Sequence, residues 1–247
     1  MEIVSIARCE NRAKGLGTWH RHVYERLDWL YCTSNTVARK NMSIMTTTLP
    51  DTSPQTVVAR RAMIDSQLRT SGVNEEYVLA RLLSVPREDF LPASKASVAY
   101  IDRAIALEDG KHLAAPLFYG KLLLEAAPMP DDTVLVVGGG TGYLAALLRP
   151  LVADLSEMTA AEAAALTAGG TGRYSLIVVD GAIEQLPDGV GAQLAEGGRI
   201  VTGLVLRQVT RLASGRKVAG QVNLQPTEDL GIPVLHAFDV PKGWTFA

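Results

Sequence analysis

Short apolar segments alternate with helical patterns through the middle of the chain. Runs rich in β-branched residues, typical of strands buried in a parallel sheet, occupy four stretches: Thr133–Val137, Leu151–Ser156 (the weakest), Tyr174–Asp180 and Arg199–Val205. Helical patterns lie between them, at Tyr143–Arg149, Thr159–Leu166 and Asp188–Leu194. This alternation predicts right-handed βαβ units and an open parallel sheet with helices on its faces, which is an α/β fold.

Helical patterns precede this core and β-rich ones follow it. Helices are predicted across Thr56–Leu83, with a break near Ser71-Gly72, and over Ala114–Ala126, where a proline suits the first turn. The later runs Val209–Leu212 and Val218–Leu224 suggest antiparallel strands. We therefore divide a domain of residues 56–247 into a helical part (56–128), a core (129–205) and a β-rich part (206–247).

The first 55 residues differ in composition from this domain. Residues 1–50 carry seven lysines or arginines against four acids, and a Thr/Ser/Pro-rich stretch follows Met42 and Met45. We expect residues 1–55 to be a basic extension and linker, with the working protein starting near one of these two methionines. Both cysteines lie in this extension, so the body offers no disulfide or thiolate metal site, which fits a reducing compartment, the cytoplasm.

Composition excludes several classes of protein. Of 247 residues, 47% are hydrophobic and 20% are charged, which is enough apolar material to form a core. The net charge of −2 provides no electrostatic surface for nucleic acid, and no apolar run approaches the roughly 18 residues of a membrane span. Cys9 and Cys32 do not form the Cys-x-x-Cys pair of a zinc site, so no metal is expected.

A glycine-rich loop, Gly138-Gly139-Gly140-Thr141-Gly142, joins the first core strand to the next helix. Backbone N–H groups at such a junction lie at the carboxyl edge of the sheet, where open α/β sheets bind ligands. Tyr143 stands where the dinucleotide pattern needs a third glycine, and no P-loop lysine is present. The remaining G-x-G-x-G spacing is typical of S-adenosylmethionine sites, although a glycine turn that only packs strand on helix remains an alternative.

Several motifs together carry a family resemblance. They are Met63–Val73, Val85–Pro92, Ala99–Arg103, the glycine loop with its following tyrosine, and Gln193–Val201. In these motifs the chain resembles the protein-L-isoaspartate O-methyltransferase family, from about Ala59 to Val205. The resemblance implies a three-layer αβα Rossmann-like sheet that binds S-adenosylmethionine at Gly138–Gly142.

The same resemblance implies an acceptor and a reaction. The substrate would be a damaged protein or peptide with an isoaspartyl carboxylate, which is methylated to begin repair. A carboxylate is already ionised at neutral pH, so the reaction needs orientation and exclusion of water rather than a general base. The motif Val85–Pro92 further suggests that Arg87 and Glu88 brace the helical part against the core.

Two departures from the family pattern affect the expected reaction centre. The family carries a serine in a segment that aligns with His112–Pro116, and Ala114 occupies that position here. The catalytic residue is therefore unknown, with His112 as a weak candidate for a polar group. The residue two before Gly138, usually acidic in such enzymes, is Val136.

A third departure is the short interval between the glycine loop and Asp180. Two βα units need more than about 40 residues, and this interval has 38 positions. We therefore expect one βα unit to be missing, so that the second strand becomes the edge of the sheet. Glu157 is the candidate ribose-binding acid, with Ser156 or a solvated helix-start acid as alternatives. Asp180 either faces the ligand or caps the next helix.

These features favour one function and leave two others open. The leading hypothesis is an S-adenosylmethionine-dependent carboxyl methyltransferase of the isoaspartyl-repair type, with Gly138, Gly139, Gly140, Thr141, Gly142, Glu157 and Asp180 at the cofactor. Because Ala114 lacks a hydroxyl, the chain is alternatively a non-catalytic family member that acts as a binding protein. A methyltransferase with a different acceptor is the third possibility.

Overall fold

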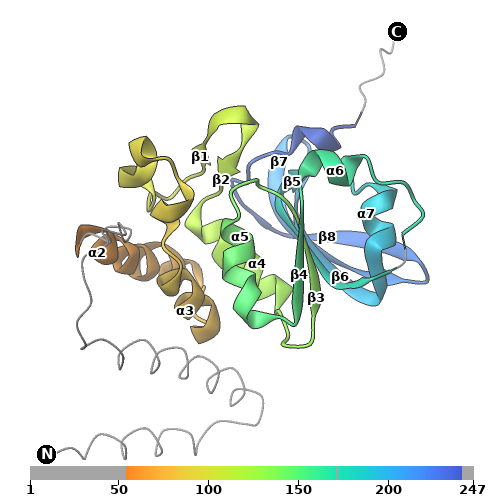
Figure 1. The fold of residues 1–247 in the computed structure, drawn as a ribbon, viewed down its shortest axis with the longest axis horizontal. Coiled ribbons are helices and arrows are strands. Elements are labelled where there is room, and N and C mark those ends of the chain that lie inside the picture. The colour runs from red at the N-terminus through yellow and green to blue at the C-terminus, as the bar shows by residue number, and fades with distance from the viewer. Residues whose placement is uncertain (1–53, 171, 241–247) are drawn as a thin grey trace, which may run out of the picture. The chain divides into compact units, whose positions relative to one another are not determined.

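The computed structural model describes residues 54–170 and 172–240, and Figure 1 shows their arrangement. The expected extension, with both cysteines and the linker, lies outside the described residues except at its end. There helix α2 (Pro54–Met63) begins two residues before the predicted domain boundary. Within the described residues, no helix is long and apolar enough to cross a membrane.

A six-stranded sheet forms the centre of the fold. Its order is β4-β3-β5-β6-β7-β8. The first four strands in this order are parallel: β4 (Asp154–Met158), β3 (Thr133–Gly138), β5 (Tyr174–Ile183) and β6 (Leu194–Leu206). An antiparallel hairpin of β7 (Val209–Val218) and β8 (Gln221–Asp229) completes the sheet.

Helices cover both faces of the parallel strands, which confirms the expected three-layer αβα fold (Figure 1). Helices α4 (Pro116–Ala126) and α5 (Tyr143–Leu148) lie on one side, and α6 (Ala160–Ala164) and α7 (Asp188–Gln193) lie on the other. The side chains of β3 alternate between two hydrophobic cores, one on each face of the sheet. Val134 and Val136 pack in the core on the α4 and α5 side, and Leu135 and Val137 pack in the core on the α6 and α7 side.

The helices and turns that precede α4 in the chain pack outside α4 and α5 (Figure 1). After α2 the chain forms a short π-helix (Ile64–Leu68) and a 3-10 turn (Arg69–Ser71). Gly72 ends them with a φ of +82°, so the predicted break is confirmed. Helix α3 (Glu76–Ser84) follows, then 3-10 turns at Arg87–Phe90 and Ala93–Val98. A short hairpin of β1 (Ile105–Ala106) and β2 (His112–Leu113) leads into α4.

The interval between β4 and β5 holds one short helix, α6, in the residues that the structure describes there. Strand β4 is consequently the edge of the sheet, as predicted from the short spacing. The strand itself begins at Asp154 rather than Leu151, because Arg149–Leu151 forms a 3-10 turn at the end of α5.

The predicted boundaries of the C-terminal strands are wrong in two places. The run Val218–Leu224 is not one strand: Ala219 and Gly220 adopt φ angles of +51° and +78° and form the tip of the β7–β8 hairpin. Strand β6 begins at Leu194 instead of Arg199, directly after α7. In both places apolar periodicity alone does not reveal where hydrogen-bonded pairing starts and stops. The described tail contains a 3-10 turn at His236–Phe238.

Candidate ligand-binding site

The loop between β3 and α5 has a backbone that requires glycine. Gly138, Gly139, Gly140 and Gly142 all have positive φ, and Gly140 N–H donates to the Gly138 carbonyl at 2.6 Å. At Gly139 the requirement is also steric, because a Cβ there would lie 2.0 Å from Asp180 Oδ2. The Gly139 backbone therefore packs directly on the Asp180 carboxylate, which an alanine would not allow.

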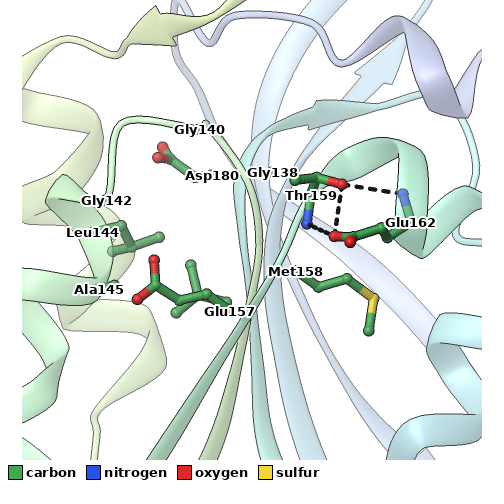
Figure 2. Close-up of a pocket in the computed structure, with 11 residues that line it drawn as sticks. Gly138, Gly140, Gly142, Leu144, Ala145, Glu157, Met158, Thr159, Glu162 and Asp180 are labelled. Atoms are coloured by element: carbon green, nitrogen blue, oxygen red, sulfur yellow. Dashed lines mark hydrogen bonds between the residues drawn. The ribbon is translucent and has the colours of Figure 1, made fainter.

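A cavity of about 180 Å³ opens beside this loop at the carboxyl edge of the sheet (Figure 2). Five of the residues predicted from the sequence line it: Gly138, Gly140, Gly142, Glu157 and Asp180. Gly139 and Thr141 belong to the same loop but are not among the lining residues. Six further residues line the cavity and were not predicted from the sequence: Val136, Leu144, Ala145, Met158, Thr159 and Glu162. Val136 and Met158 lie near the carboxyl ends of their strands, and the other four cap or begin helices, so their place at the sheet edge could have suggested them.

Asp180 lies on β5 opposite Gly138 of β3 and is almost fully buried. Its Oδ1 atom has no hydrogen-bond partner. Burial raises the pKa of this carboxyl to about 7, although hydrogen bonding with Tyr119 and the charge of Arg87 act in the opposite direction. The alternative prediction that Asp180 caps the next helix is wrong, because α7 begins only at Asp188.

Glu157 lies near the end of β4, with its side chain beside the cavity (Figure 2). Its carboxylate accepts a hydrogen bond from Arg149 Nη2 at 2.9 Å, and the side chain is about half exposed. The alternative that Glu157 starts a helix is wrong: Thr159 caps α6, and Glu162 completes a capping box with it. Ser156, the other aligned candidate, is not among the lining residues.

A fully buried arginine lies below the site. Arg87 donates to the Ala99 carbonyl at 2.8 Å and to the Ala114 carbonyl at 2.7 Å, and its guanidinium lies over the rings of Tyr119 and Tyr143. Burial raises the pKa of Tyr143 to about 12, and its hydroxyl has no hydrogen-bond partner. Arg87 therefore braces the helical part against the core, as the sequence motif suggested.

Glu88 takes part in a second bracing contact, between α2 and the segment before β1. Its carboxylate accepts from Arg60 Nη2 at 3.0 Å and from the Tyr100 hydroxyl. Arg60 also donates to the Tyr100 hydroxyl at 2.7 Å and to the Leu83 carbonyl at 3.0 Å. Arg60 and Tyr100 both belong to the helical part, so Glu88 braces that part internally, and the expectation that it braces the helical part against the core is not met.

The segment aligned with the family's reaction centre is held rigidly but contributes no hydroxyl. Ala114 is buried, and its N–H donates to the Tyr119 hydroxyl at 3.2 Å while its carbonyl accepts from Arg87. His112 lies on β2, opposite Ala106, and is not among the residues that line the cavity. Among the described residues, no group of three or more His, Cys, Asp or Glu side chains could hold a metal ion.

A glycine loop after the first parallel strand, a cavity at the carboxyl edge and a terminal antiparallel hairpin define the class of Rossmann-like methyltransferase folds. The profile of the protein-L-isoaspartate(D-aspartate) O-methyltransferase family matches residues 59–165. A protein-L-isoaspartate O-methyltransferase of Koribacter versatilis is 33% identical over 193 residues, which cover 69% of this chain and 87% of that protein. A protein-L-isoaspartate O-methyltransferase of Roseiflexus castenholzii is 35% identical over 182 residues, which cover 64% of this chain and 83% of that protein. The chain belongs to the protein-L-isoaspartate O-methyltransferase family.

Solved structures agree on the fold. A protein-L-isoaspartate O-methyltransferase from Plasmodium falciparum, in complex with S-adenosyl-L-homocysteine, superposes with a TM-score of 0.57 at 16% identity. The match covers 72% of this chain and 98% of that one. A second protein-L-isoaspartate O-methyltransferase structure has a TM-score of 0.56 at 18% identity. The expected family and the expected fold class are both confirmed.

Proposed function

We propose that this protein is an S-adenosylmethionine-dependent carboxyl methyltransferase that acts on isoaspartyl residues of damaged proteins. Membership of the family supports this function, and the observation that carries it is the cavity beside the glycine loop. That cavity lies where the loop, the end of β4 with Glu157 and β5 with Asp180 come together, and residues of β3, α5 and α6 complete its lining. We further propose that the protein works in the cytoplasm in protein repair, in agreement with its cysteine-free body.

The residues around the cavity fit the cofactor. Bare glycine backbone allows close approach of the amino-acid end, and the Asp180 carboxylate on the cavity wall has a buried oxygen, Oδ1, that no protein group satisfies. We expect Glu157 to bind the ribose hydroxyls, because it lines the cavity from the strand next to β3. The cavity is smaller than the roughly 300–1,000 Å³ of typical ligand pockets, and β4 on one side of it is the edge strand of the sheet. We therefore expect the adenine end to be more exposed to solvent than in a protein with a further βα unit.

When bound, the cofactor supplies an electrophilic methyl group. The task of this chain is to orient an acceptor carboxylate and exclude water, because that carboxylate is ionised at neutral pH and needs no general base. Arg87 and Tyr119 hold both backbone polar groups of Ala114, so the segment aligned with the reaction centre is fixed in place. We expect this rigid backbone, rather than a serine hydroxyl, to shape the acceptor side.

A second candidate function is ligand binding without methyl transfer. The specific observation that favours it is Ala114, which offers no hydroxyl where the family has one and which is buried against Tyr119. In that case the protein would bind S-adenosylmethionine but leave an isoaspartyl peptide unmethylated.

Two measurements separate these functions. Calorimetric titration and thermal shift with S-adenosylmethionine are expected to show binding under both hypotheses, and no heat with no shift at millimolar ligand would reject both. Methyl transfer from labelled cofactor to an isoaspartyl peptide, with the matching aspartyl peptide as control, then distinguishes them. The Ala114→Ser variant belongs in the same assay: a reaction that appears only with this variant identifies the native chain as a binding protein.

A further inference from the structure

The charged side chains that line the cavity are all acidic. They are Glu157, Glu162 and Asp180, and no lysine, arginine or histidine is among the lining residues. A partly enclosed site with this lining favours a ligand group that carries positive charge. Of the three acids, Asp180 is the one that is both buried and incompletely paired.

Glu157 and Glu162 already have partners within the protein. Glu157 pairs with Arg149 and is about half exposed. Glu162 Oε2 accepts from Thr159 N–H and from the Thr159 hydroxyl, both at 2.8 Å, in the capping box of α6. Asp180 differs: its residue is 6% exposed, its Oδ1 has no partner, and it lies under the loop between Gly138 and Gly142 (Figure 2).

The strand register explains how Asp180 reaches this place. Leu176 and Val178 of β5 pack in the core on the α4 and α5 side, and strand alternation puts the side chain of Asp180 on that same face. Opposite Asp180 in the register is Gly138, where the loop begins. The residues of β3 that line the cavity are Val136 and Gly138, so β3 itself brings no charge to the cavity.

Arg87 does not neutralise Asp180 through a hydrogen bond. Its Nε and Nη2 donate to the carbonyls of Ala99 and Ala114, and its Nη1 has no partner. The groups that act on the Asp180 carboxyl are this guanidinium and the Tyr119 hydroxyl. The Lys111 side chain approaches Gly140 on the loop above. The carboxylate is thus left with an unpaired, buried oxygen, which is costly unless a ligand satisfies it.

We propose that the Asp180 carboxylate binds the ammonium group at the amino-acid end of the methyl donor and is the anionic anchor of this site. The inference rests on the proposed function. The packing of β5 does not require a buried carboxylate at position 180, and binding of the ammonium group gives this carboxylate a role. It also explains why Gly139 must be a glycine: the loop has to pass directly over the carboxylate that holds the ligand.

The test uses S-adenosylhomocysteine, which retains the ammonium group and lacks the sulfonium. Calorimetric titration at pH 7.5 compares the full chain, its Asp180→Asn variant and the control Asp131→Asn, an exposed residue of the turn before β3. Loss of a charge-assisted hydrogen bond predicts affinity about 10- to 100-fold weaker for Asp180→Asn, and unchanged affinity for the control. Thermal unfolding of each variant verifies that it is folded.

A second measurement uses the unaltered protein and so does not depend on a variant that folds. A bound ammonium favours the ionised carboxylate, so affinity falls as the pH drops through the pKa of Asp180, which is about 7. We expect affinity to weaken about eightfold from pH 7.5 to pH 6. At pH 6.5, binding should release about three quarters of a proton, measured as the difference in heat between buffers of different ionisation enthalpy.

Four outcomes overturn the inference. The first is Asp180→Asn affinity equal to that of the unaltered protein, and the second is binding with no proton release. The third is an Asp180→Asn variant that binds S-adenosylmethionine more weakly but S-adenosylhomocysteine as tightly as the unaltered protein, which would assign Asp180 to the sulfonium instead. The fourth, absence of S-adenosylhomocysteine and S-adenosylmethionine binding by the unaltered protein, rejects the proposed function as well. Binding with an unaffected variant rejects only the role of Asp180.

Discussion

The buried Asp180 carboxyl should make the stability of this protein depend on pH in a direction opposite to that of most acidic groups. Its pKa is raised from an ordinary value of 3.8 to about 7, and burial is the cause. In the folded protein the Asp180 carboxyl therefore keeps its proton up to neutral pH, whereas in the unfolded chain the same carboxyl loses its proton near pH 4. Between these values the folded state binds more protons, so its stability falls as the pH rises.

The magnitude follows from the two pKa values. Each pH unit within this window corresponds to about 1.4 kcal/mol, and the effect levels off above pH 7. From pH 5 to pH 8 the contribution of Asp180 to the free energy of unfolding should decrease by about 3 kcal/mol. Asp132 and Glu88 have lowered pKa values, and their effects lie at more acidic pH.

Replacement of Asp180 by Asn isolates this effect, because the amide keeps the shape of the side chain and removes the titration. Urea unfolding of both proteins, followed by circular dichroism at pH 5, 6, 7 and 8, gives the difference in their free energies of unfolding. We expect the original protein to lose about 3 kcal/mol relative to the variant across this range. A difference that stays constant from pH 5 to pH 8 would refute the reasoning, since it would mean that Asp180 does not titrate there.

Three further substitutions test the packing around the site and below it. Gly139→Ala should cost about 3 kcal/mol, because its Cβ would meet Asp180 Oδ2 and its φ is +62°. Arg199→Met should cost about 3–5 kcal/mol, because it leaves Asp132 buried without the ion pair whose Nη2–Oδ2 distance is 2.6 Å. Thr159→Ala should cost about 1 kcal/mol through loss of the α6 cap. Urea unfolding measures all three.

Matched controls define what would contradict these predictions. Gly142 has a similar φ of +76°, but a Cβ there would have no atom outside its adjacent residues within 4 Å, so Gly142→Ala is the control for Gly139→Ala. If both variants lost the same free energy of unfolding, the contact with Asp180 would not matter. The double variant Asp132→Asn with Arg199→Met should recover part of the free energy of unfolding that Arg199→Met loses. If it recovers none, the destabilisation does not come from an unpaired charge on Asp132. A Thr159→Ser variant should retain the cap and the stability.

The parts of the site that follow one another in the sequence were predictable. The first core strand was expected at Thr133–Val137 and runs from Thr133 to Gly138, and the helix after the loop begins at Tyr143 as predicted. Local chemistry is sufficient here: β-branched residues favour the strand, and only glycines allow the loop to turn. The shortened interval before Asp180 likewise predicted that β4 would be the sheet edge, because chain length limits how many elements an interval can hold.

The environment of each acid could not be predicted in this way. Glu157 and Asp180 were both candidate ligand contacts with equally plausible structural alternatives. The folded structure gives them different environments. Glu157 pairs with an arginine in a solvent-exposed position, while Asp180 is buried beneath the loop. Burial depends on segments distant in sequence, since Arg87 and Tyr119 reach Asp180 from the 3-10 turn after α3 and from α4.

The sequence by itself thus determined the α/β class, the family, the glycine loop and the missing βα unit, because each depends on local residue types and on spacing. Only the tertiary structure decided which acid is buried, that Gly139 must pack on Asp180, and that Arg87 and Tyr119 clamp both backbone groups of Ala114. These features depend on desolvation and on distances between side chains far apart along the chain, and both arise only when the sheet and its two helical layers come together.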